Sequence, residues 1–223
     1  MTQTIAAEIT RKQLNRKLIL ASPLILTATN YLTARLGVHF FGQWAWVPFQ
    51  IGYWLVITLL IRYSGGWKVV LEAYKRPTGW GWWIPCIVIG LIPLPILLHY
   101  RGLIHQPLLI ASWLIIAVVN PFFEERYWRG VFGDVTEKWP TFLACLYPTF
   151  FFACGHPLGL GVFSIGCRRA DMLISLFVMG FVWSYIYRKT RSLRAVTFSH
   201  NLIDLFNMSV WVYMNILIPK NGF

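Results

Sequence analysis

Long apolar segments separated by short polar stretches dominate the pattern of the chain. Seven segments, most of them close to twenty residues long, alternate with stretches that carry most of the Lys and Arg residues. A helix needs about 20 apolar residues to cross a bilayer core of about 30 Å, so these segments have the length of membrane spans. The predicted spans are 18–36, 44–62, 80–99, 107–133, 139–156, 170–188 and 194–218.

Two amphipathic stretches flank these spans. The first sixteen residues form a basic entry, and residues 65–77, "GGWKVVLEAYKRP", separate apolar from charged positions at helical spacing. The second stretch therefore predicts a short helix in the membrane interface. Its apolar face comprises Trp67, Val70, Leu71 and Tyr74, and its charged face comprises Lys68, Glu72, Lys75 and Arg76.

The composition supports a membrane protein. Hydrophobic residues make up 57% of the 223 residues and charged residues only 13%, whereas a soluble domain has about 25% charged residues. We predict an all-α, polytopic transmembrane bundle of seven or eight helices with one interfacial helix. The eighth would be a span or re-entrant piece near 157–169. We expect a single domain over 1–223, with its motif-bearing core at 107–218.

The net charge of +12 gives an orientation rather than a nucleic-acid partner, because the basic residues lie in clusters between apolar segments. Fifteen Lys and Arg residues fall on the N-terminal side of the predicted topology and five on the other side. The positive-inside rule then predicts a cytoplasmic N-terminus in the plasma or inner membrane. "TRKQLNRK" precedes a full-length span without a small-residue cleavage site, so no cleavable signal peptide is expected.

Two adjacent acids interrupt the fourth apolar segment, in "NPFFEERYWRGVF" at residues 120–132. Ionisable groups in a membrane are costly and usually mark function. Adjacent positions point about 100° apart on a helix, so Glu124 and Glu125 cannot share one partner. Arg129 lies four residues after Glu125, which is the favoured order for a helical ion pair. Glu124 therefore needs a partner on another helix.

Two further stretches supply candidate partners. "FFFACGHPLG" predicts an aromatic helix that ends at His156, before a proline and a glycine. "TFSHNLIDLFN" places His200, Asp204 and Asn207 on one face of a helix. Helical depths of about 21 and 27 Å from the turn near residue 138 let Glu124 and His156 meet. We expect one polar cluster in the cytoplasmic half of the membrane.

Three motifs resemble those of the CPBP family of intramembrane glutamic proteases, which includes CAAX prenyl proteases, Abi proteins and bacteriocin-processing relatives. "EERYWR" matches EExxxR, "FACGH" matches FxxxH from Phe152 to His156, and "HNLID" is close to HxxxN. The motifs cover residues 124–204 and occur in the family's order, each in a predicted membrane helix. The first three spans match the family only in being hydrophobic.

The resemblance implies hydrolysis of a peptide bond, with Glu124 and His156 activating a water and with His200 and residue 204 stabilising the oxyanion. Elementary chemistry agrees, because a carboxylate in a low-dielectric cavity suits a general base. No cofactor is expected. The departure is Asp204, where the family often has Asn, because an ionised Asp cannot donate a hydrogen bond. We expect Asp204 to orient His200 or to stay protonated, with Asn207 as a possible substitute donor.

Glu125, Arg129, Phe152 and Asn207 are expected to support the site rather than to react. Two alternatives stay open. One is a zinc-dependent metalloprotease that uses a Glu and two His, although the chain lacks HExxH. The other is a non-catalytic membrane protein, such as an immunity factor, a scaffold or a small transporter. The expected partners are membrane lipids and a peptide or lipid-modified protein substrate in the membrane. The sequence predicts neither the substrate's identity nor the oligomeric state.

Overall fold

The computed structural model describes residues 2–63 and 66–218, with side chains described for 16–63 and 70–218. The side chains of the predicted basic entry before residue 16, and those of Trp67 and Lys68 on the predicted interfacial helix, lie outside the described residues. Throughout the described ranges the secondary structure is helical, without strands. The predicted all-α fold class is confirmed.

The helices follow the predicted segments closely. A π-helical segment, η3, continues α6 into α7, and short 3-10 turns η1, η2, η4 and η5 join other helices. The helices are α1 Thr2–Phe41, α2 Trp46–Tyr63, α3 Gly66–Lys75, α4 Trp80–Leu91, α5 Leu94–Tyr100, α6 Pro107–Glu125, η3 Arg126–Val131, α7 Phe132–Val135, α8 Thr141–Leu158, α9 Ala170–Thr190, α10 Arg194–Phe206 and α11 Ser209–Tyr213. The 3-10 turns are η1 Gly42–Trp44, η2 Arg101–Leu103, η4 Leu160–Val162 and η5 Gly166–Arg168.

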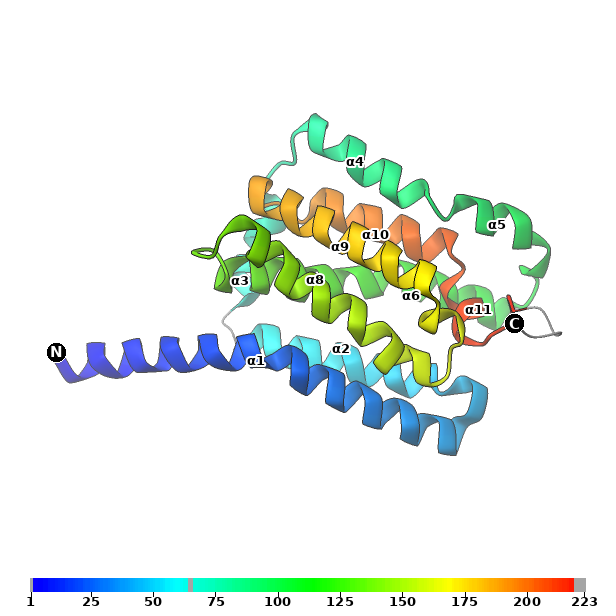
Figure 1. The fold of residues 1–223 in the computed structure, drawn as a ribbon, viewed down its shortest axis with the longest axis horizontal. Helices are drawn as coiled ribbons and strands as arrows, with labels where there is room; N and C mark the ends of the chain where they lie inside the picture. The colour runs from blue at the N-terminus through cyan, green and yellow to red at the C-terminus, as the bar shows by residue number, and fades with distance from the viewer. Residues whose placement is uncertain (1, 64–65, 219–223) are drawn as a thin grey trace.

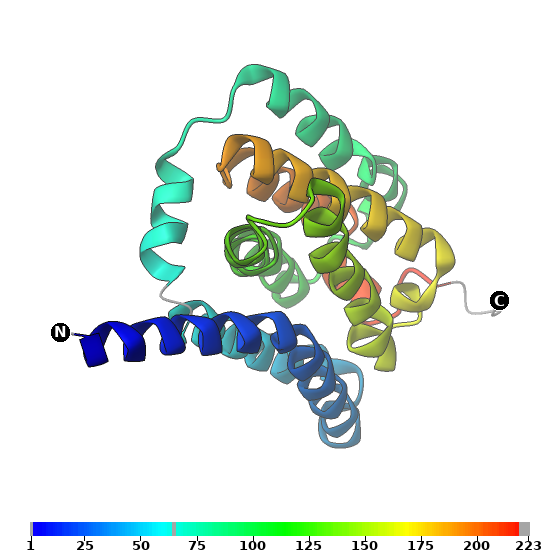
Figure 2. The same cartoon turned by 60° about the vertical axis from the view of Figure 1, so that its left-hand side comes forward.

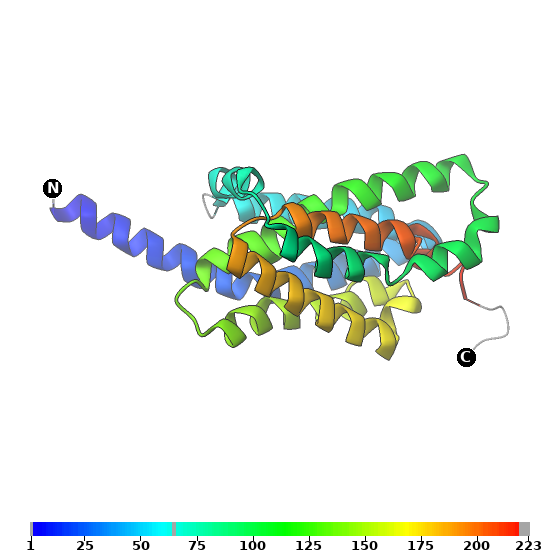
Figure 3. The same cartoon turned by 90° about the horizontal axis from the view of Figure 1, so that it is seen from above.

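Helix α6 lies near the middle of the bundle (Figure 2). Together with η3 it contacts α2, α3, α8, α9 and α10, while α1 pairs with α2 and α8 pairs with α9. Helix α10 packs between α4 and α6. The N-terminal part of α1 projects beyond the bundle (Figures 1 and 3). Because α6 carries the acidic pair, its central position lets side chains from several helices reach that pair.

Two predicted spans are broken rather than continuous. The span predicted over 80–99 is found as the candidate span Trp80–Leu103, but its helix is interrupted, because α4 ends at Leu91 and α5 starts at Leu94, with Pro93 at its N-cap. The prediction of one helix over 194–218 is wrong. Helix α10 ends at Phe206, and Met208 has a φ of +54°, a left-handed conformation that commonly terminates helices. A smaller difference is that α8 continues past His156 to Leu158.

Four helices in the described part of the chain are long and apolar enough to cross a membrane. Large hydrophobic side chains also face outward on the bundle, among them Ile84, Ile92, Leu108 and Ile174, each more than 60% exposed. A soluble monomer rarely exposes so much apolar surface. The four spans are Trp80–Leu103, Pro107–Val135, Thr141–Val162 and Ala170–Thr190. The count of seven or eight spans stays a prediction.

The predicted interfacial helix is α3, and it packs onto one end of the bundle. Val70 is fully buried, and the Tyr74 hydroxyl lies 2.8 Å from the Thr197 hydroxyl. Arg194 donates hydrogen bonds to the carbonyl oxygens of Tyr74 and Lys75. Helix α3 therefore covers the start of α10 at the end of the bundle where the basic loops gather.

The close approach of α4 and α10 generates a prediction about packing. A Cβ at Gly90 would lie 2.9 Å from Leu202 Cδ1 and 3.2 Å from the Ser199 carbonyl oxygen. Gly90→Val should therefore push α4 away from α10 and cost about 1–3 kcal/mol of stability, measured by thermal unfolding in detergent. Gly81→Val is the matched control in the same helix, because a Cβ at Gly81 meets nothing within 4 Å. Equal unfolding temperatures for the two variants would contradict the packing.

Candidate functional site

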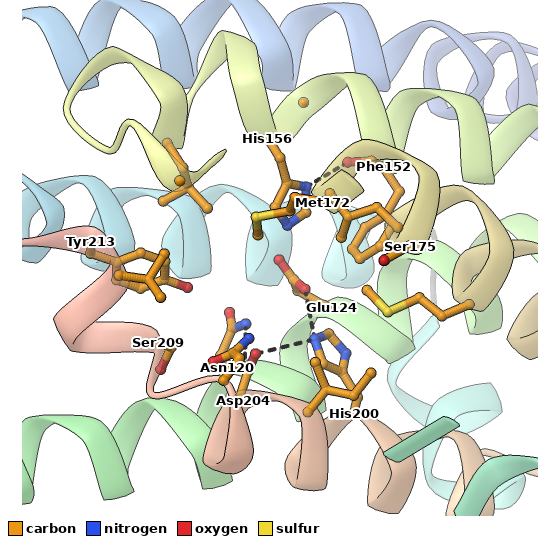
Figure 4. Close-up of a pocket in the computed structure, with 18 of the residues that line it drawn as sticks. Asn120, Glu124, Phe152, His156, Met172, Ser175, His200, Asp204, Ser209 and Tyr213 are labelled. Atoms are coloured by element: carbon orange, nitrogen blue, oxygen red, sulfur yellow. Dashed lines mark hydrogen bonds and ion pairs between the residues drawn. The ribbon is translucent and has the colours of Figure 1, made fainter. Parts of the chain in front are cut away.

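A cavity of about 770 Å³ lies beside α6 and is lined mainly by apolar side chains. Its polar lining includes Glu124, His156, His200 and Asp204, so the four residues predicted to react share one cavity (Figure 4). From these groups the cavity extends to the end of the bundle that carries η5 and α11. Its lining there includes Gly166, Arg169, Val212, Tyr213 and Leu217.

The adjacent acids of α6 have different surroundings. Both are buried, with Glu124 5% exposed and Glu125 fully covered. Glu124 lines the cavity and lies between His156 and His200 in Figure 4. Glu125 is not part of the cavity lining; its Oε1 accepts a hydrogen bond from Arg129 Nη1 at 3.0 Å. The predicted i,i+4 ion pair is thus confirmed, and both of its side chains are buried.

The Arg129 guanidinium packs against two aromatic rings and a glycine. It lies 4.5 Å from the ring centre of Phe152 and 5.1 Å from that of Trp183, on α8 and α9. A desolvated cation over an aromatic ring gains about 2 kcal/mol. Gly180 leaves the space, because a Cβ there would lie 3.3 Å from Arg129 Nη2. Phe152 also contacts the rings of both site histidines, at 4.9 Å for His156 and 6.3 Å for His200.

His200 is held on three sides. Its Nδ1 lies 2.8 Å from Glu125 Oε1, and its ring stacks on Trp183 at 4.9 Å and 28°. Since a carboxylate only accepts, Nδ1 carries the hydrogen and Nε2 faces the cavity. There Nε2 lies 3.4 Å from Glu124 Oε2. Glu124 therefore has the partner on another helix that the sequence predicted.

Asp204, expected to orient His200 or to stay protonated, makes a longer ion-pair contact to His200 than Glu125 does, and its role stays a prediction. Glu125 makes the short contact to the ring, whereas Asp204 Oδ1 lies 3.8 Å from Nε2. The physical reason is that Glu125 reaches Nδ1 from the facing helix, while Asp204 lies one turn along the same helix. Asp204 instead accepts a hydrogen bond from Asn120 Nδ2, at 3.2 Å from Oδ2.

His156 lies on the last turns of α8, where its Nδ1 is 2.8 Å from the Phe152 carbonyl oxygen. A carbonyl accepts, so Nδ1 is the protonated nitrogen and Nε2 has a free lone pair in the neutral ring. The ring points into the cavity on the opposite side of Glu124 from His200 (Figure 4). Asn207, the C-cap of α10, is half-buried and also lines the cavity.

Sequence reasoning missed several residues of the site. Asn120 lies one turn before Glu124, within the same quoted stretch, and this i,i+4 spacing was a usable signal. Its Oδ1 accepts hydrogen bonds from Gln50 Nε2 at 2.8 Å and from Trp54 Nε1 at 3.0 Å. Gln50 and Tyr53 on α2 line the cavity. The stacking of Trp183 on His200 had no local sequence signal.

The sequence provided no reason to expect a cofactor. Among the described residues, no three His, Cys, Asp or Glu side chains are arranged to hold a metal ion. The four cysteines are free thiols, and Cys154, although close to His156 in sequence, does not line the cavity.

Residues 106–206 match the family model "Type II CAAX prenyl endopeptidase Rce1-like". This segment is Rce1-like. The resemblance predicted from the three motifs is confirmed over it, and the Rce1-like segment contains Glu124, His156, His200 and Asp204. No curated protein and no solved structure matches the chain. The Rce1-like family indicates a CAAX-type intramembrane protease, and with the four apolar helices it indicates an integral membrane protein.

The buried ion pair of the Rce1-like segment generates a stability prediction. Arg129→Ala would leave the Glu125 carboxylate buried without its cation, so we expect a loss of about 3–5 kcal/mol and a lower folded yield in detergent. Lys75→Ala is the matched control, because the Lys75–Glu72 pair is 72% and 57% exposed and should contribute little. A normal unfolding temperature with abolished turnover in Arg129→Ala would instead assign the pair to the chemistry.

Proposed function

We propose that the chain is an intramembrane endopeptidase of the glutamic type, with Glu124 as general base. The observation that carries the proposal is the separation of the two adjacent acids. Glu125 is occupied by Arg129 and His200, at 3.0 and 2.8 Å, and lies outside the cavity. Glu124 faces the cavity, where a water and a peptide could meet it.

The proposed reaction is a water attack on the carbonyl carbon of the scissile bond. Glu124 takes one proton as the water oxygen bonds to carbon, and the carbonyl electrons move onto oxygen. The C–N bond then breaks as the nitrogen receives that proton, directly or through His156 Nε2. General acid–base catalysis of this kind contributes about 10²–10⁴ in rate. His200 Nε2 supports the developing negative charge when it is protonated.

The remaining residues have supporting roles in this proposal. Glu125 and Arg129 hold His200 and the end of α6, while Phe152 contacts the rings of both histidines. Asn207 and Asp204 line the cavity without a proton-transfer role. The substrate is proposed to be a peptide or a lipid-modified protein held in the membrane, since most of the cavity wall is apolar. The chain acts as one domain over 1–223.

Replacing Glu124 tests the function directly. Glu124→Gln keeps the shape and removes the base, so turnover of a fluorogenic peptide ending in a prenylated CAAX sequence should fall about 10²–10⁴-fold. Glu72→Gln is the matched control, because Glu72 is an exposed acid on α3. Mass spectrometry of membrane peptides that accumulate with Glu124→Gln would identify the natural substrate.

Two outcomes would favour the alternatives. Wild-type function in a folded Glu124→Gln variant would support a non-catalytic membrane protein. Inactivation by a chelator, with recovery on adding zinc, would support a metalloprotease.

The same proposal includes seven or eight spans with a cytoplasmic N-terminus, argued from the charge asymmetry of the loops. The helices α3 and α11 lie at opposite ends of the bundle (Figure 1). The basic loops gather at the end covered by α3, whereas the cavity lining includes residues of η5 and α11. With this orientation the cavity opens on the non-cytoplasmic side, although its acid lies nearer the cytoplasmic end of α6. Helix α6 with η3 and α7 places Glu124 about 17 Å from Val135 and about 26 Å from Pro107.

Thiol labelling tests the orientation. We expect a membrane-impermeant maleimide to label Leu217→Cys in intact cells and to lower turnover, because Leu217 lines the cavity. Leu71→Cys, on the exposed surface of α3, should be labelled only after the membrane is opened. The reverse pattern would place the N-terminus outside and the cavity mouth in the cytoplasm.

A further inference from the structure

The third motif of this chain lacks a hydrogen-bond donor at residue 204. Residue 204 is Asp in this chain, and an ionised carboxylate cannot donate a hydrogen bond to an oxyanion. The side chain that faces Asp204 across the cavity wall is Asn120, on α6. Its Nδ2 lies 3.2 Å from Asp204 Oδ2, and both residues are buried and line the cavity. An amide and a carboxyl thus lie together on facing helices.

The orientation of the Asn120 amide is fixed by its other contacts. Oδ1 accepts hydrogen bonds from two donors on α2, Gln50 Nε2 at 2.8 Å and Trp54 Nε1 at 3.0 Å. A flipped amide would place an N–H group against both donors, so the network assigns oxygen and nitrogen unambiguously. The NH₂ group consequently faces Asp204 and the cavity.

The Asn120 side-chain nitrogen has more N–H donors than it has hydrogen-bond acceptors among the described residues. An Asn side chain carries two N–H donors, and the hydrogen bonds among the described residues account for one of them, to Asp204. A second N–H at the cavity wall can serve a bound substrate. Asp204 accepts from the same amide and so holds it in place.

The position of Asn120 relative to the proposed base is also suitable. Asn120 and Glu124 lie four residues apart on α6, and both line the cavity. Side chains at this spacing are neighbours, with Cβ atoms about 5–6 Å apart. A peptide carbonyl attacked by water at Glu124 would therefore have its oxygen within reach of the residue one turn earlier.

We propose that Asn120 supplies the oxyanion N–H, with Asp204 as the residue that positions its amide. The proposal rests on the proposed peptidase function and adds a catalytic residue from outside the three motifs. The amide comes from α6 and the carboxyl from α10.

The test compares single and exchanged variants on the prenylated CAAX peptide. Asn120→Ala should lower kcat about 10²–10³-fold, the usual effect of losing one oxyanion donor, with KM nearly unchanged. Asn120→Asp should lose comparable activity, because it replaces the N–H with oxygen. The exchange variant, Asn120→Asp together with Asp204→Asn, carries the amide on α10 instead of α6, so it should recover most of kcat.

Asn201→Ala is the matched control. Asn201 also joins α10 to α6, donating to the carbonyl oxygen of Ala117 at 2.6 Å, but it does not line the cavity. It should change the unfolding temperature without the large loss in kcat.

The outcomes separate this proposal from the function on which it rests. Wild-type kcat in folded Asn120→Ala would overturn the role of Asn120 while Glu124→Gln stays inactive. A folded exchange variant that is no more active than Asn120→Asp would overturn it as well. If the exchange variant does not fold, the comparison of Asn120→Ala with Asn201→Ala decides alone. Full activity in Glu124→Gln would instead remove the peptidase function itself.

Discussion

The arrangement of the site depends on one buried chain of charges, Arg129–Glu125–His200. A single charge buried without a partner costs several kcal/mol, but here one carboxylate oxygen receives hydrogen bonds from both a guanidinium and an imidazole. These three side chains link η3 to α10. Through the rings of Phe152 and Trp183 they also link both to α8 and α9. Glu125 is shared by both partners, so removing it would leave Arg129 without its ion pair and His200 without its hydrogen bond, and the positions of four helices are coupled through it.

This coupling has a chemical consequence for the neighbouring acid. Glu125 Oε1 is held by Arg129 and His200, whereas Glu124 faces a cavity and the far nitrogen of the same imidazole, at 3.4 Å. The helix changes from α to π directly after this pair, and π segments often occur at functional sites because they re-aim side chains. In η3, Trp128 donates to the Tyr53 hydroxyl at 3.0 Å while Arg129 turns back to Glu125. The π-helical segment thus positions both Trp128, which lines the cavity, and Arg129, which pairs with Glu125.

The local part of this arrangement could be predicted from sequence, and the long-range part could not. The spacing of four residues was enough to predict the Glu125–Arg129 pair, and the length of the apolar segments was enough to predict most helices. The bond from Glu125 to His200 joins residues 75 positions apart, and no periodicity carries that information. The family resemblance named His200 but not its orienting partner. The break at Met208 has no Gly or Pro signal, whereas the break at Pro93 follows from "IPLP" and was visible.

A motif position defines chemistry only together with what faces it. Asp204 looks unsuitable when it is considered alone, because an acid replaces an amide donor. In the structure it faces Asn120, so an amide and a carboxyl lie together at the cavity wall. Gln50 and Trp54 on α2, outside the Rce1-like segment, fix which end of that amide meets the cavity. Helix α2 therefore contributes to the site's hydrogen bonding although it carries none of the motifs. An oxyanion site needs a donor at the right point in space, and either facing helix can provide it.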